Sequence, residues 1–292
     1  MQALYALSVR HLFLSCLVLA APSLFAAYPA RDLVIPVAGR AYNAAGRQFL
    51  TALWLTNTDE RSAASVTLSF LPSGHANPSP RQVRLTLGKG ATLLLEPLDG
   101  QLLGSADAMG AVRVESTTNV IAHARIYTTD AAGGSIGMGF AAIPTRHAIG
   151  NGQSTILQGI TLGNSRYRTF IVETAGAALT IAVTLHDLAG NTLGEKRLFV
   201  DRFEHIRADV QELFPAVKVE RAILTVRGVN GNGRVVVAGA QIAAGSEDPS
   251  AFEMSFAPEP RWHIGWPEAA VYIAVAAVII AALVVRRPSS RE

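Results

Sequence analysis

The chain has 292 residues, of which 50% are hydrophobic and 16% are charged, and its formal net charge is +3. Of its 25 Lys and Arg residues, four (Arg10, Arg286, Arg287 and Arg291) lie in the terminal segments, and of its 22 Asp and Glu residues only Glu292 does. The long central part is therefore formally neutral, which excludes a nucleic-acid-binding protein and provides no long-range attraction for acidic ligands.

Residues 1–26 have the pattern of a secretory signal peptide. Arg10 precedes the apolar stretch Leu12–Ala21, and Ala26 offers a small residue for cleavage, with cleavage one residue later as the alternative. Cys16 is the only cysteine and lies inside this segment. The mature protein therefore has no disulfide, thiol nucleophile or Cys-based metal site. Lipidation of Cys16 is an alternative, but Phe13-Leu14-Ser15 matches a lipobox poorly.

The central part consists of short segments that alternate apolar and polar residues between Gly, Asn, Pro and Asp, as in all-β proteins. Three blocks recur in order at a nearly constant offset, which predicts two copies of one unit, at residues 31–145 and 150–256. The matching blocks are Phe49–Leu53 and Tyr167–Ile171, Val66–Leu68 and Val183–Leu185, and Val120–Ile126 and Val236–Ile242.

Strands and turns can be placed within each copy. Alternation predicts that six side chains of two neighbouring strands face inward: Val66, Leu68, Phe70, Val83, Leu85 and Leu87. Further strands are expected at Thr92–Leu95 and His205–Asp209, a hairpin around Ser116-Thr117-Thr118, and a turn at Asn230–Gly233. Short helical turns are expected at Leu98–Leu103 and Val210–Phe214.

The first copy resembles a module repeated in large exported bacterial surface proteins. The residues that carry the resemblance are Val34–Ala38, Thr51–Asn57, Val66–Leu68 and Gly110–Ser116. It covers most of residues 31–145 and is weaker over 150–256, where Glu173-Thr174-Ala175 replaces the Leu-Thr-Asn block. The resemblance implies immunoglobulin-like sandwiches without catalytic residues. The expected fold is thus all-β, with two tandem antiparallel Ig-like β-sandwich domains followed by one C-terminal transmembrane helix.

One motif raises the question of catalysis. Gly133–Gly137 matches the G-x-S-x-G nucleophile elbow, with Ser135 as nucleophile and His147 and Asp187 as nominal partners. The motif lies in a Gly-rich turn between strand-like segments, so a hairpin loop is the preferred interpretation and an exported serine hydrolase is an alternative. No histidines have a metal-ligand spacing, and no cofactor is expected.

A candidate partner-contact face lies on the strand Asn119–Tyr127. If Val120 and the residues two, four and six positions later point inward, His123, Arg125 and Tyr127 point outward, and Trp54 can join them. Aromatic residues and Arg are enriched at contact sites for proteins, and a surface glycan is a further candidate partner. The alternative is that Trp54 and Tyr127 merely cover a sheet or a neighbouring module.

The uncharged run Ala269–Val285 has 17 residues and reaches about 26 Å as a helix, enough for a short membrane span. Trp262 and Trp266 precede it and Arg286 and Arg287 follow it, as interfacial and cytoplasmic flanks do. The lipid bilayer is therefore an expected partner, with the C-terminus cytoplasmic and the modules in the periplasm or outside the cell.

Two shorter segments flank this run, a linker at residues 257–268 and a tail at residues 286–292. Pro258-Glu259-Pro260 resembles part of a removable sorting signal, but eight residues separate it from the apolar run, and Pro267-Glu268 takes the place next to that run. We therefore predict an uncut anchor. The expected function is a non-enzymatic envelope protein for adhesion, assembly or display, and the alternative is an accessory or sensor subunit of a membrane complex.

Overall fold

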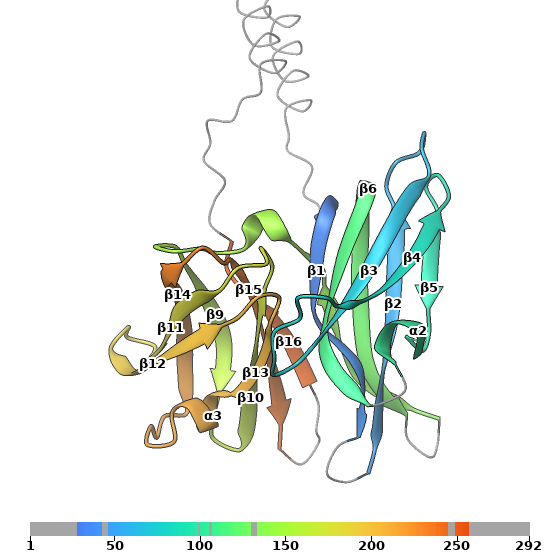
Figure 1. Ribbon diagram of the computed structural model, residues 1–292. Coiled ribbons are helices and arrows are strands. Elements are labelled where there is room, and N and C mark those ends of the chain that lie inside the picture. Colours follow the sequence, from blue (N-terminus) through green and yellow to red (C-terminus); the bar gives the residue numbers. More distant parts are fainter. Residues whose placement is uncertain are drawn as a thin grey trace, which may run out of the picture. The chain divides into compact units, whose positions relative to one another are not determined.

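The computed structural model describes residues 28–42, 46–98, 100–104, 107–129, 133–244 and 249–256. Within these residues every pairing between strands is antiparallel, and helices are confined to three short turns. The predicted all-β fold is confirmed (Figure 1). The alternation of apolar and polar residues accounts for it, since no described segment has the long 3.6-residue period of an amphipathic helix.

The first half of the chain forms eight strands that hydrogen-bond into one sheet with the path β4-β3-β6-β1-β2-β5, to which β7 and β8 are added. The elements are β1 (Ala30–Tyr42), β2 (Gln48–Asn57), β3 (Ala64–Pro72), β4 (Arg81–Leu87), β5 (Thr92–Leu95), α2 (Gly100–Leu103), β6 (Ala108–Thr129), β7 (Ser135–Ala141), β8 (Ile143–Pro144) and the 3-10 turn η1 (Thr145–His147). The first part of β6 pairs with β1 and β3, and its last part pairs with β2 and β7. One strand therefore belongs to both layers of this half, which we call the first sandwich.

The hairpin predicted around Ser116 is wrong, because β6 runs through these residues as one 22-residue strand. The polar groups that suggested a turn are satisfied by neighbouring strands. The Thr117 hydroxyl accepts a hydrogen bond from the backbone N–H of Ser65, and the Thr118 hydroxyl donates one to Oδ1 of Asn57. The pairing of β6 with β1 is irregular here, so the strand bends from one layer to the other instead of reversing.

The second half, which we call the second sandwich, repeats this connectivity. Its elements are β9 (Ser154–Thr161), β10 (Ser165–Glu173), β11 (Leu179–His186), β12 (Thr192–Val200), β13 (His205–Asp209), α3 (Val210–Leu213), β14 (Arg221–Gly231), β15 (Val235–Ala243) and β16 (Pro249–Glu253). They form two four-stranded sheets, β13-β10-β15-β16 and β12-β11-β14-β9. The first sandwich has the same neighbours in the orders β5-β2-β6-β7 and β4-β3-β6-β1.

The observed strand pairing differs from the residue-by-residue alignment of the two copies that the repeat blocks predict. In the first sandwich Leu53 lies opposite Ala124, so the repeat blocks predict Ile171 opposite Ala240. Ile171 instead pairs with Val237. The register of β10 against β15 therefore differs by three residues from the predicted register. A shift by an odd number of residues moves every side chain of a strand to the other face of the sheet.

The core of the first sandwich follows the predicted alternation. Four of the six residues expected to face inward are buried in it, and the other two, Val83 and Leu85, are partly buried and pack against it. The expected strands at Thr92–Leu95 and His205–Asp209 match β5 and β13, and the expected helical turns contain α2 and α3. These inward-facing residues, strands and helical turns could be predicted from the pattern of neighbouring residues alone.

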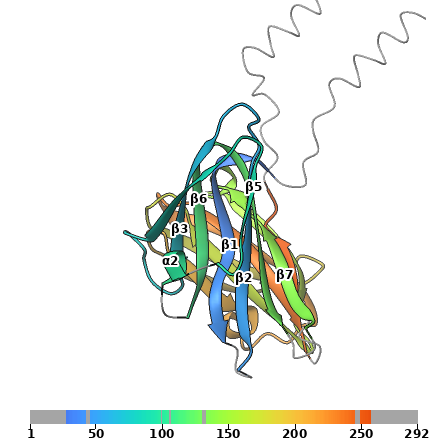
Figure 2. The ribbon, with the colours of Figure 1, turned by 90° about the vertical axis from the view of Figure 1, so that its right-hand side faces the viewer.

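The sheet β13-β10-β15-β16 is covered on both of its faces. One face packs into the second sandwich, and the other packs against the first, so that β15 is buried along most of its length. The ring centroids of Phe140 on β7 and Phe170 on β10 lie 5.9 Å apart at 84°, and Val37, Ile126 and Ala238 join them in one apolar cluster. Figure 1 shows the two sandwiches side by side, and Figure 2 shows the first sandwich in front of the second.

Polar contacts complete this junction. The backbone N–H of Gly74 donates to the His205 carbonyl at 2.9 Å, and the side-chain amide of Asn77 donates to the Phe203 carbonyl at 2.9 Å. The guanidinium of Arg113 lies 5.4 Å from the centroid of the Phe203 ring. The described residues up to Ser255 accordingly belong to one compact unit rather than two loosely joined domains.

Among the described residues, no helix is long and apolar enough to cross a membrane. The predicted signal peptide (1–26), linker (257–268), transmembrane helix (269–285) and tail (286–292) all lie outside the described residues. The same is true of the predicted anchor flanks Trp262, Trp266, Arg286 and Arg287.

Candidate functional site

Part of the predicted contact face forms a row across three strands of the first sandwich. Trp54 on β2 lies directly opposite His123 on β6, with ring centroids 6.1 Å apart. On the other side Trp54 pairs with Leu94 on β5, whose side chain is 44% exposed. Leu94, Trp54 and His123 therefore present an apolar and aromatic surface to solvent, which we call the contact row.

Gly139 on β7 leaves space beside this row. Gly139 pairs with Arg125, and a Cβ atom at Gly139 would come within 2.8 Å of Nε2 of His123. The imidazole ring therefore lies where a side chain on β7 would otherwise stand. Partial burial lowers the pKa of His123, so the ring is neutral near pH 7.

Arg125 lies on the same face of the sheet as His123 and is held by two contacts. Its Nη2 donates a hydrogen bond to the Ser135 hydroxyl at 2.8 Å, and its guanidinium lies 5.3 Å from the centroid of the Tyr127 ring. The prediction that Tyr127 is an exposed member of this face is wrong, since its side chain is buried at 9% exposure. Burial, and secondarily the nearby Glu96 carboxylate, raise the pKa of Tyr127.

Ser135 lies at the start of β7, opposite Thr129 at the end of β6. The G-x-S-x-G motif thus enters an antiparallel strand, whereas a nucleophile elbow lies between a strand and a helix in an α/β sheet. The Ser135 hydroxyl accepts its hydrogen bond from Arg125 rather than from a histidine. His147 lies in η1 beside Tyr28, and the Asp187 carboxylate accepts bonds from the backbone of Ala189 and Asn191 in its own turn.

Acidic and histidine side chains are the groups of the described residues that could ligate a metal ion. Within the part of the chain that the structure describes, no group of three or more such residues is arranged to hold a metal ion. His186 next to Asp187 lies at the end of β11, where its Nδ1 is 3.4 Å from the Thr192 hydroxyl. This pair belongs to the turn between β11 and β12.

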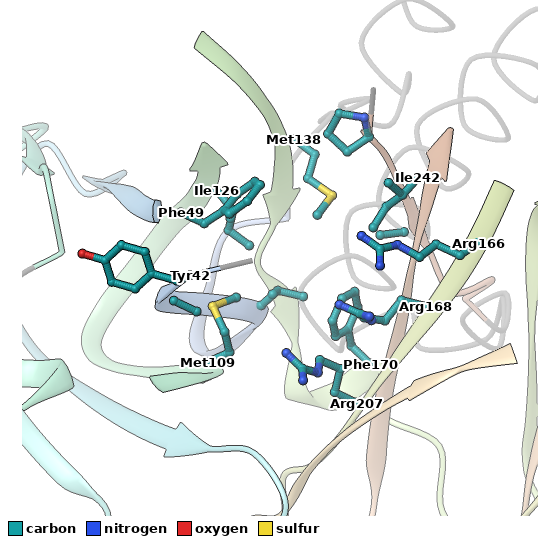
Figure 3. A pocket seen from close by; sticks show the side chains of 14 residues that line it. Tyr42, Phe49, Met109, Ile126, Met138, Arg166, Arg168, Phe170, Arg207 and Ile242 are labelled. Carbon is teal, nitrogen blue, oxygen red and sulfur yellow. The ribbon is translucent and has the colours of Figure 1, made fainter. Parts of the chain in front are cut away.

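The junction of the two sandwiches contains a cleft that the sequence pattern does not predict. It has a volume of about 160 Å³, and three arginines of the second sandwich, Arg166, Arg168 and Arg207, reach into it (Figure 3). The R-x-R spacing on β10 places two of these side chains on one face. No local pattern indicates that this face meets another sandwich, or that Arg207 joins them from β13.

Comparisons of the chain with protein-family models, with curated proteins and with solved structures find no match.

Proposed function

We propose that this protein is a non-enzymatic, exported envelope protein, anchored in the membrane by its C-terminal segment, that acts in adhesion, assembly or display. In this proposal the two sandwiches are Ig-like modules, and the contact row binds a protein or surface-glycan partner. The observation that supports it most directly is the row of Leu94, Trp54 and His123, in which Leu94 and His123 are exposed and Trp54 is partly buried, because aromatic surface with a polar margin is typical of contact sites.

The shared apolar junction is consistent with this role. Two sandwiches that share an apolar cluster within one compact unit hold a surface patch in place, which favours presentation to a partner over closure around a substrate. The placement of Ser135 in a strand, with its hydroxyl bonded to Arg125, further favours binding over acyl-transfer chemistry.

Site-specific photo-crosslinking in the producing cells tests the proposal. A photoreactive residue in place of Leu94 is expected to form one dominant adduct, whereas the same residue in place of Phe199, which is 63% exposed on the second sandwich, is expected to form none. Replacing Trp54 and His123 together with alanine is expected to abolish the Leu94 adduct, because truncation of aromatic anchors costs the most binding energy. Equal adducts from both sites would contradict a dedicated face.

Localisation has its own test. A protease added outside intact cells, or outside spheroplasts where an outer membrane is present, is expected to digest the modules and to spare a tag at the C-terminus. Digestion of the tag would refute the anchored topology. Labelling of the intact protein by a serine-directed fluorophosphonate probe, lost in Ser135→Ala, would instead favour a hydrolase.

A further inference from the structure

The cleft between the two sandwiches combines an apolar wall with a cationic one. The first sandwich contributes Tyr42, Phe49, Met109 and Met138, and the second contributes the three arginines that Figure 3 shows reaching toward the two methionines. Methionine side chains are flexible and polarisable, so they adapt to apolar groups of different shapes. The volume of about 160 Å³ is close to that of a cavity known to hold one benzene molecule, about 150 Å³.

The strand register explains why the three arginines lie on one face of the sheet. Arg166 and Arg168 alternate along β10, so both lie on the face of the sheet that carries Phe170 and meets the first sandwich. Arg207 on β13 lies directly opposite Phe170, and Asp209 lies opposite Arg168. Cross-strand partners share a face, and all three guanidinium groups therefore extend from one surface.

Among the described residues, Arg168 is the only one of these three arginines that forms a hydrogen-bonded ion pair. The Asp209 carboxylate accepts two hydrogen bonds from Arg168, at 2.5 and 3.0 Å. Among the described residues, Arg166 and Arg207 have neither a hydrogen-bond acceptor nor an ion-pair partner for their side chains. Burial, and then the charge of Arg168, lower the pKa of Arg207, while the nearby Asp209 and Glu212 carboxylates oppose this shift, and the guanidinium remains protonated at neutral pH.

We propose that this cleft binds a small organic carboxylate, whose anionic head is held by Arg166 and Arg207 and whose apolar group, about the size of a phenyl ring, lies against Met109 and Met138. Planar guanidinium groups match the geometry of a carboxylate and can bond both of its oxygens. The apolar wall disfavours fully hydrated anions such as phosphate, because nothing on that side replaces their bound water. This site is independent of the contact row.

The test uses the full-length protein in nanodiscs and phenylacetate as the probe, with binding followed by saturation-transfer NMR and calorimetry. We expect saturable binding, and binding of the uncharged isostere phenylacetamide at least about tenfold weaker, since a charge-assisted hydrogen bond contributes that much or more. Equal affinity for the two compounds, or no saturable binding of phenylacetate, would overturn the proposal.

Variants locate the site. Arg166→Gln together with Arg207→Gln is expected to weaken phenylacetate binding at least about tenfold, whereas Arg227→Gln on β14, an exposed arginine away from the cleft, leaves it unchanged. Met138→Trp, which fills the apolar side, is expected to weaken binding while the arginines remain. Unchanged binding in the arginine double variant, or an equal loss in Arg227→Gln, would refute the site.

A further binding experiment distinguishes a small-molecule carboxylate from the C-terminal carboxylate of a peptide. The peptide acetyl-Gly-Gly-Phe carries the same ring and a free carboxylate on a longer chain, and acetyl-Gly-Gly-Phe-amide is its uncharged control. For a site adapted to small molecules, the peptide acid is expected to bind no more tightly than phenylacetate. Peptide binding at least about tenfold tighter, lost in the amide, would overturn the small-molecule assignment in favour of a peptide terminus.

Discussion

The hydroxyl of Ser73 and Nδ1 of His205 lie 2.6 Å apart and join the two sandwiches across 132 positions of sequence. Because the same hydroxyl donates to the Met109 carbonyl at 2.8 Å, Nδ1 of His205 carries the proton and donates to Ser73. The ring stacks on Phe170, with centroids 6.0 Å apart, and its side chain is fully buried. Nε2 has no hydrogen-bond partner among the described residues. His205 is thus held as a neutral ring inside the junction.

This neutral histidine predicts a loss of stability in acid. Burial lowers the pKa of His205 to about 4, assisted by the charge of Arg207 and opposed by the Pro36 carbonyl. The unfolded chain, with an ordinary histidine pKa near 6.5, binds the proton first. The contribution of neutral His205 to the free energy of unfolding is therefore present above pH 6.5 and is lost as the pH falls toward 4. At pH 5 the loss is roughly 2 kcal/mol.

Urea unfolding at pH 7 and pH 5 measures this effect. His205→Asn, which keeps a side-chain donor near Ser73, is expected to show a smaller difference between the two pH values than the wild-type protein does. His186→Asn, at the end of β11, serves as the control and is expected to keep the wild-type difference. Identical pH dependence in His205→Asn and the wild type would show that another group is responsible.

Phe170 is expected to stabilise both sandwiches together. Its ring lies in the apolar cluster at the junction, edge-on to Phe140. Phe170→Ala should reduce the free energy of unfolding by about 3–5 kcal/mol and preserve a single unfolding transition. Phe199→Ala, at an exposed position, should change it by less than about 0.5 kcal/mol. Calorimetry and circular dichroism report the transition, and two separated transitions in the wild type would contradict a shared core.

Glu173 is expected to be required for folding of the second sandwich. The side chain is fully buried, and its carboxylate accepts hydrogen bonds from the backbone N–H groups of Ala175, Gly176, Phe203 and Arg234 at 2.7 to 3.1 Å. Glu173→Ala leaves these donors unsatisfied and should cost at least about 3 kcal/mol.

Glu195→Ala, at an exposed position on β12, is the matched control and should have little effect on the unfolding midpoint in urea. Glu173→Gln retains one acceptor oxygen and should fall between the alanine variant and the wild type. If Glu173→Ala lowers the unfolding midpoint no more than Glu195→Ala does, the hydrogen bonds of the Glu173 carboxylate to the backbone do not stabilise the second sandwich.

Gly239 is expected to tolerate no side chain. It lies on β15 beneath the ring of Tyr167, and a Cβ atom there would overlap the Tyr167 hydroxyl and come within 2.7 Å of Cε1. The ring is itself buried and its hydroxyl donates to the Gln158 carbonyl at 3.1 Å, so it has no free space to move into. Gly239→Ala should cost about 1–3 kcal/mol or more through overpacking.

The control for Gly239 is Gly163→Ala, because the nearest atom to a Cβ there is Cγ of Glu220 at 3.8 Å. Thermal unfolding of the two variants should differ clearly, with Gly163→Ala close to the wild type. Equal melting temperatures would show that Tyr167 can adopt another position.

Local pattern determined much of this fold. Period-two alternation identified the inward residues of β3 and β4, and it placed β5 and β13 at their observed bounds. The repeat blocks indicated two copies, and both sandwiches have the same order of neighbouring strands. The outward direction of His123 and Arg125 on β6 also follows from alternation. These features depend only on which side of a strand each residue occupies, and neighbouring positions encode that directly.

Tertiary structure decided the features that depend on partners. Polar Ser116-Thr117-Thr118 looks like a turn, yet β6 continues because Asn57 and Ser65, both distant in sequence, satisfy these residues. Glu173 begins the segment that replaces the Leu-Thr-Asn block of the first copy. Only the structure shows that its carboxylate accepts hydrogen bonds from the backbone of three separate segments.

The junction between the two sandwiches also depends on residues that are distant in sequence. The chain is formally neutral between its terminal segments, but the register of β10 against β13 gathers Arg166, Arg168 and Arg207 at one cleft. Alternation assigns the residues of β15 to two faces of the sheet, but it does not predict which part of the protein packs against each face. Both sets are buried here, one within the second sandwich and one against the first. The sequence by itself determined the strands and their two faces. Which surface covers each face depends on long-range packing, and no local period records it.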